Sequence, residues 1–69
     1  MYEVYKDVGR GPVLIGVTGN AVYAVKIAKE SLDREEGLGA AWVQKNGQQV
    51  ARYETVVEYP GYYKIARLD

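Results

Sequence analysis

Asn46 and Gly47 stand between two runs of residues that are typical of β-strands, Ala40 to Lys45 and Gln48 to about Tyr59. This pair is the strongest short signal for a β-hairpin, because a two-residue type I′ turn requires positive φ angles at both central positions. Such a turn also determines which residues lie opposite each other on the two strands. The predicted pairs are Lys45–Gln48, Val43–Val50, Trp42–Ala51 and Ala40–Tyr53.

A second hairpin is predicted near the N-terminus. Apolar and polar residues alternate between Tyr2 and Val8, which is the period of a half-buried strand. The stretch from Gly9 to Pro12 has the composition of a turn, and Val13 to Val17 supplies β-branched residues at every second position.

The segment from about Gly19 to Glu36 is predicted to form a helix, with Thr18 or alternatively Asn20 as its N-cap. Its small and apolar residues share one broad face: Ala21, Ala24, Val25, Ile27, Ala28, Ser31 and Leu32. Opposite charges four residues apart support this helix at three pairs: Lys26–Glu30, Lys29–Asp33 and Glu30–Arg34. Gly37 is expected to end the helix, since glycine readily adopts the left-handed conformation after a last turn.

Pro60-Gly61 predicts a further turn and Tyr62 to Leu68 a last strand, all within one domain of residues 1–69. We therefore predict an α+β fold of order ββαβββ, in which one helix packs on one face of a five-stranded antiparallel or mixed sheet. The residues expected to face the helix are Ala51, Tyr53, Thr55, Val57, Trp42 and Ala40. The apolar residues expected on the other face are Tyr5, Leu14, Val43, Val50, Val56 and one of Tyr62 and Tyr63.

The residue types on which many enzymes depend are missing from the sequence. Its 69 residues include no histidine and no cysteine, which removes Cys–His and Ser–His nucleophile pairs, disulfides and Cys/His zinc sites. The carboxylates of Asp33, Glu35 and Glu36 fall at a solvated helix end, where surface charge is their ordinary role. We therefore expect no enzymatic activity, no metal and no cofactor. No apolar run is long enough for a signal segment or a membrane span, so we expect a cytoplasmic protein with no membrane partner.

Seven tyrosines without one phenylalanine point to protein binding. A tyrosine side chain suits a position where its ring is buried and its hydroxyl reaches water. Tyrosine is also frequent among the interface residues that contribute most to binding energy. We predict a non-enzymatic binding module, an adaptor, subunit or inhibitor, whose partner is another protein or a second copy of itself. The predicted partner-binding residues are Tyr5, Leu14, Val43, Val50, Arg52 and Tyr63, with Lys45 at the rim. Replacing Val43 and Val50 with lysine is expected to abolish binding and to leave the monomer folded.

Binding of single-stranded nucleic acid is the alternative, with exposed tyrosines as stacking platforms for bases. The formal net charge of zero weighs against it, because phosphate contacts normally require a basic face.

In size and element order the chain resembles many short bacterial and bacteriophage proteins, among them small inhibitors such as anti-CRISPR proteins. The resemblance covers size and element order only, and no site residue is carried over from it.

Overall fold

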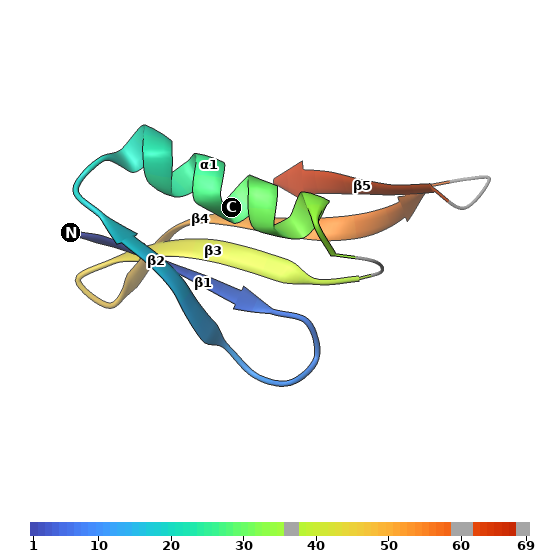
Figure 1. The fold of residues 1–69 in the computed structure, drawn as a ribbon, viewed down its shortest axis with the longest axis horizontal. Coiled ribbons are helices and arrows are strands. Elements are labelled where there is room, and N and C mark those ends of the chain that lie inside the picture. The colour runs from blue at the N-terminus through green and yellow to red at the C-terminus, as the bar shows by residue number, and fades with distance from the viewer. Residues whose placement is uncertain (36–37, 59–61, 68–69) are drawn as a thin grey trace.

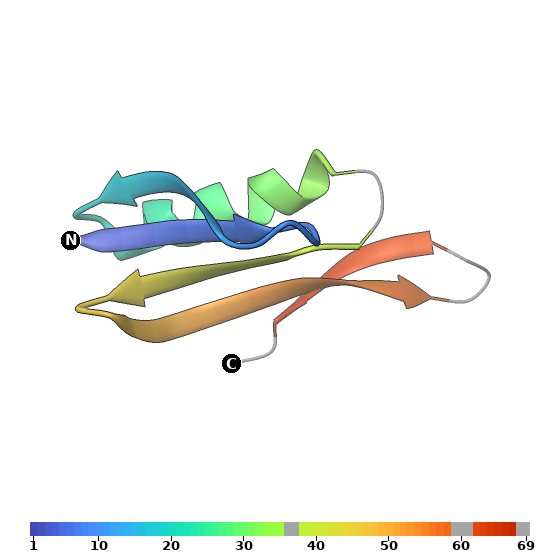
Figure 2. The ribbon, with the colours of Figure 1, turned by 90° about the horizontal axis from the view of Figure 1, so that it is seen from below.

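The computed structural model describes residues 1–35, 38–58 and 62–67, and the side chains of residues 1–35 and 38–56. The elements are β1 (Tyr2–Asp7), β2 (Val13–Thr18), α1 (Ala21–Asp33), β3 (Ala40–Lys45), β4 (Gln48–Glu58) and β5 (Tyr62–Arg67). The strand order in the sheet is β2-β1-β3-β4-β5, and each strand is antiparallel to its neighbours. The helix α1 lies along one side of this sheet (Figures 1 and 2).

The predicted α+β class is confirmed, with one helix and the four antiparallel strands β2, β1, β3 and β4. The first strand is internal, because β1 pairs with β2 on one side and with β3 on the other. The expected turn at Pro60 and Gly61 and the expected helix end at Gly37 lie outside the described residues.

The helix is shorter than predicted and begins with Asn20 as its N-cap, the alternative to Thr18. The side-chain oxygen Oδ1 of Asn20 accepts a hydrogen bond of 3.0 Å from the backbone N–H of Tyr23. Thr18, two residues before Asn20, supports the cap, because its hydroxyl accepts a hydrogen bond of 3.1 Å from the Asn20 N–H. Two of the predicted ion pairs are present on the helix surface, Lys26–Glu30 at 4.0 Å and Arg34–Glu30 at 3.9 Å.

The hairpin of β3 and β4 turns at Asn46 and Gly47, as predicted, with φ angles of 53° and 75°. The first predicted pair, Lys45 opposite Gln48, is also present. Beyond Gln44 the register shifts by one residue, because a β-bulge leaves Val50 as an extra residue and brings Ala51 opposite Val43. The predicted pairs Val43–Val50, Trp42–Ala51 and Ala40–Tyr53 are therefore wrong.

This one-residue shift inverts β3 relative to the prediction, since neighbouring side chains on a strand point to opposite faces. Val43 was expected on the face away from the helix, but it is 1% exposed and belongs to the core beneath the helix. Trp42 and Ala40 were expected to face the helix, and they lie on the other face with their pairing partners Arg52 and Glu54. Val50 is also misplaced by the prediction, because it borders a cavity with the helix residues Ala21 and Val25.

The core between helix and sheet is made largely of small side chains. Its buried residues are Val4, Ala24, Ala28, Leu32, Ala41, Val43, Ala51 and Tyr53. Alanines on both the helix and the sheet let the two layers approach closely, while Leu32 and Tyr53 fill the remaining volume. The predictions that Ala51 and Tyr53 face the helix are confirmed.

A second bulge lies between β1 and β2. Val4 pairs with Gly16 and Tyr5 pairs with Leu14, so that Ile15 is the extra residue. Gly16 lies close beneath the helix, where an added Cβ would come within 3.2 Å of the Ile27 side chain. The close approach of α1 to this strand therefore depends on the missing side chain.

Candidate functional site

In the described part of the chain one face of the sheet carries no helix, and we call it the open face (Figure 2). Strand alternation and pairing place eleven described residues on it: Glu3, Tyr5, Asp7, Leu14, Val17, Ala40, Trp42, Gln44, Gln49, Arg52 and Glu54. Val56 follows on the same side of β4, two residues after Glu54, as predicted.

Three side chains from three neighbouring strands form a stack on the open face. Tyr5 and Arg52 lie directly across from Trp42 in β1 and β4, on either side of β3. The rings of Tyr5 and Trp42 are stacked, with centroids 5.9 Å apart and planes 17° apart. The Arg52 guanidinium carbon lies 5.1 Å from the Trp42 ring centre, which is the geometry of a cation–π contact.

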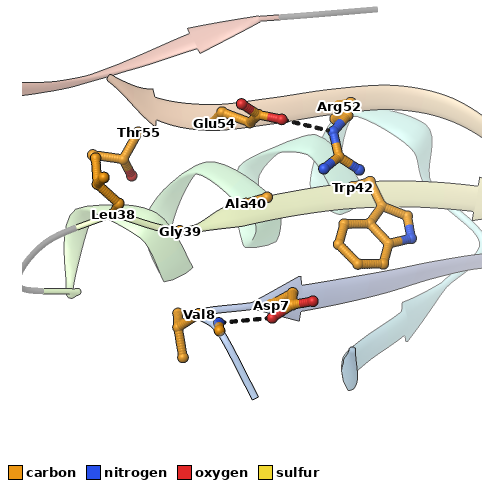
Figure 3. A pocket seen from close by; sticks show the side chains of 10 residues that line it. Asp7, Val8, Leu38, Gly39, Ala40, Trp42, Arg52, Glu54 and Thr55 are labelled. Carbon is orange, nitrogen blue, oxygen red and sulfur yellow. Dashed lines mark hydrogen bonds and ion pairs between the residues drawn. The ribbon is translucent and has the colours of Figure 1, made fainter. Parts of the chain in front are cut away.

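Two polar contacts hold this stack in position. The indole Nε1–H of Trp42 donates a hydrogen bond of 2.8 Å to Oε1 of Gln44. The Arg52 Nε–H donates to the Glu54 carboxylate at 3.1 Å, which keeps the guanidinium over the indole (Figure 3). Trp42 is only 9% exposed although it lies outside the helix-side core cluster. Its neighbours on the open face therefore cover it.

A pocket of about 500 Å³ adjoins the stack (Figure 3). Its lining consists of Asp7, Val8, Gly9, Leu38, Gly39, Ala40, Trp42, Arg52, Glu54 and Thr55. Asp7 shapes one wall, because its Oδ1 accepts hydrogen bonds from the backbone N–H groups of Gly9 at 2.8 Å and Gly11 at 3.2 Å. Both glycines have positive φ angles, 104° and 94°, so this turn requires residues without a Cβ.

Thr55 on β4 also borders the pocket. Its hydroxyl is buried, not open to the pocket, and has no hydrogen-bond partner among the described residues, while its backbone N–H donates to the Gly39 carbonyl at 2.9 Å. The hydrogen-bonding groups of the pocket are therefore the side chains of Asp7, Glu54 and Arg52, and Val8 and Leu38 add apolar surface.

The structure brings together part of the predicted binding set. Tyr5, Leu14 and Arg52 lie on the open face. Leu14 is 48% exposed at its margin. Val43 and Val50 do not lie there, for the reasons given above. The Tyr63 side chain lies outside the described residues, as does that of Tyr62.

The predicted rim residue Lys45 lies on the helix side. It is opposite Tyr2 on β1, and its amine is 5.0 Å from the centre of the Tyr2 ring. Lys45 and Val50 border a separate cavity of about 270 Å³ next to the helix.

The sequence analysis missed Trp42, Asp7 and Glu54 as members of the site. Trp42 was assigned to the helix-side core through the register error. The signal that identifies it is the alternation of β3 itself, because Ala41 and Val43 form a small apolar pair suited to a close helix, whereas Trp42 alternates with the polar Gln44.

No group of three or more acidic side chains in the described part of the chain is placed to hold a metal ion. None of the helices among these residues is long and apolar enough to cross a membrane. No family model matches the chain, and neither does any curated protein or solved structure with which it was compared.

Proposed function

We propose that this chain is a non-enzymatic protein-binding module that acts in the cytoplasm as an adaptor, subunit or inhibitor. Its contact surface is the open face, with Tyr5, Trp42 and Arg52 at the centre and Leu14 at the margin. The observation that carries the proposal is the Tyr5–Trp42–Arg52 stack on a sheet face that no helix covers. The fifth strand widens this surface beyond β4.

The residue types in the stack favour a protein partner. Tryptophan, tyrosine and arginine are the three residues most enriched among those that contribute most to binding energy at interfaces. In this chain Gln44 holds Trp42, Glu54 holds Arg52, and Tyr5 stacks on Trp42. A partner therefore loses little binding energy to the ordering of flexible side chains.

The adjoining pocket gives the partner a place for an anchoring side chain. Val8 and Leu38 are exposed at its margin and supply apolar contact. The carboxylates of Asp7 and Glu54 supply acceptors for a donor group at the tip of such a side chain. We expect the anchor to be long and amphipathic, with an apolar stem and a donating end.

Charge on the open face favours protein over nucleic acid. Its described residues carry three carboxylates, on Glu3, Asp7 and Glu54, and one guanidinium, on Arg52. An acidic surface repels phosphates, whereas tight binding of single strands relies on a basic groove.

A capture experiment with paired variants tests the proposal. Immobilised protein is incubated with cell lysate, and bound proteins are quantified by mass spectrometry for the wild type, for Tyr5→Ala/Arg52→Ala and for the helix-surface variant Val22→Ala. We expect the open-face variant to lose about tenfold or more of a captured partner, since hot-spot truncations cost about 2 kcal/mol or more. The helix variant should capture it normally.

The same proposal is tested with the purified partner and with nucleic acid. Calorimetry on the purified partner should reproduce the tenfold difference. The proposal would be contradicted if the Val22→Ala variant failed to bind the partner while the Tyr5→Ala/Arg52→Ala variant still bound it. Fluorescence anisotropy with a labelled single-stranded oligonucleotide should show no binding, and binding that weakens steeply with salt would favour the nucleic-acid alternative.

A further inference from the structure

The strand β2 forms an edge of the sheet, and it is unusual for an edge. It is the last strand on its side in the order β2-β1-β3-β4-β5, so its outer backbone groups face no neighbour in the described part of the chain. Its sequence, VLIGVT, contains no charged residue. Val13 is 57% exposed, and Leu14 and Val17 are each 48% exposed.

Natural proteins usually protect a free edge with charged side chains, proline or a bulge, because unpaired N–H and C=O groups recruit further strands. On β2 the only such device is the bulge at Ile15. This bulge has a second effect, which follows from the direction of each side chain along the strand.

The side-chain directions of β2 form a pattern that is the same in both chain directions. Val13, Gly16 and Thr18 pair with Lys6, Val4 and Tyr2, which lie on the helix side. The extra residue Ile15 also points to the helix side, where it borders a cavity with Tyr23 and Ile27. Leu14 and Val17 pair with Tyr5 and Glu3 on the open face. From residue 13 to residue 18 the order is helix side, open, helix side, helix side, open, helix side.

We propose that β2 pairs in antiparallel fashion with β2 of a second copy of this chain, about a two-fold axis between Ile15 and Gly16. In this register Val13 lies opposite Thr18 of the other copy, Leu14 opposite Val17, and Ile15 opposite Gly16. Every pair then joins side chains that point to the same face. A shift of one residue places Leu14 opposite Gly16 or Thr18, which point to the other face, so this register is strongly selected.

The pattern favours a second copy over a strand of another protein. A two-fold interface requires a surface that is complementary to itself, and the palindromic order of directions has that property. The absence of charge on β2 means that no like charges meet when two identical strands approach. Leu14 and Val17 of both copies then form one apolar cluster of four side chains on the open face.

On the helix side a cavity of about 330 Å³ is bordered by Lys6, Ile15, Tyr23, Ile27, Glu30, Ser31 and Arg34. Ile15 is its one residue from β2, so in the paired molecule the cavity of each copy would adjoin the interface at this residue. The pairing also joins the two open faces into one surface, because a two-fold axis perpendicular to the sheet leaves both on the same side.

Charge variants test the pairing and its register by molar mass in solution. The wild type should change from monomer to dimer with rising concentration, with little dependence on salt. Leu14→Lys/Val17→Lys places lysines opposite each other twice, and it should weaken the dimer by about tenfold or more. Leu14→Glu/Val17→Lys places opposite charges together at both positions, and it should restore the dimer. Val22→Lys, at an exposed helix position, should have no effect.

Circular dichroism identifies any variant that fails to fold. A disulfide crosslink provides a second measurement of the pairing, because the chain has no native cysteine. Under oxidation a mixture of Leu14→Cys and Val17→Cys proteins should form a disulfide dimer faster than either protein alone. A wild type that remains monomeric at its highest soluble concentration would overturn the pairing, and so would equal masses for the two double charge variants. Neither measurement includes a partner, so failure here leaves the proposed function standing.

Discussion

Val43 contributes to the fold from the centre of the core, between Val4 on β1 and Ala51 on β4, its two pairing partners. It is 1% exposed, and the helix covers it with alanine side chains. Val50, seven residues later in the chain, is the extra residue of the bulge and is 47% exposed. Two valines in one hairpin therefore have very different energetic roles.

Lysine substitutions separate these roles. Val43→Lys puts a charge into a core that holds no buried charged side chain among the described residues, and it should cost several kcal/mol. A chain of 69 residues has a total stability of about 3–10 kcal/mol, so this variant should be mostly or fully unfolded. Val50→Lys should change the free energy of unfolding by less than about 1 kcal/mol. Urea denaturation followed by circular dichroism checks both, and equal losses for the two variants would contradict the placement of Val43.

The hairpin of β3 and β4 shows which structural features of an element can be predicted from its own sequence. Asn46-Gly47 specifies a local backbone conformation, and the turn is predicted correctly because only two residues determine it. The bulge at Val50 brings Ala51 opposite Val43, so that Ala41 and Val43 on β3 and Ala51 on β4 all belong to the core beneath the helix, and this arrangement involves two strands and the helix together. No residue pattern in β4 predicts this bulge. The open face was therefore predicted correctly for Tyr5 and Arg52 and incorrectly for β3.

The start of α1 depends on one side chain. Asn20→Ala removes the acceptor for the Tyr23 N–H and should lower stability by about 1 kcal/mol. For a domain of this size, that corresponds to a fall of about 4–8 °C in the melting temperature. Asn20→Asp keeps an acceptor at the same position and should melt close to the wild type. Thermal scans by circular dichroism compare the two, and an unchanged melting temperature for Asn20→Ala would show that the cap contributes nothing.

The whole molecule consists of two layers, and its one tryptophan lies on the face away from the helix. Trp42 therefore reports on the open face, whereas far-ultraviolet circular dichroism reports on the helix and sheet together. The stack with Tyr5 and Arg52 is attached to three strands that also form the floor of the core. The two faces of the sheet should therefore lose their structure together.

Coincident transitions are the expected result of unfolding in urea. Tryptophan fluorescence and circular dichroism should give the same midpoint, because a domain this small normally unfolds in one cooperative step. The emission maximum should move to longer wavelength on unfolding, since Trp42 is only 9% exposed in the folded chain. A fluorescence midpoint well below that of circular dichroism would show that the open face loosens before the core.

The internal position of β1 has a consequence for the newly made chain. Asp7 pairs with Ala40, 33 residues later, and Tyr2 pairs with Lys45, 43 residues later, so β1 gains its second neighbour only after most of the chain has been made. The helix is also followed in the sequence by three residues that cover its inner side, namely Val43, Ala51 and Tyr53. At about 5–20 residues per second, the roughly 20 residues from Asp33 to Tyr53 take about 1–4 s to synthesise. On the ribosome, the helix segment is thus complete seconds before β3 and β4, the strands that complete its burial.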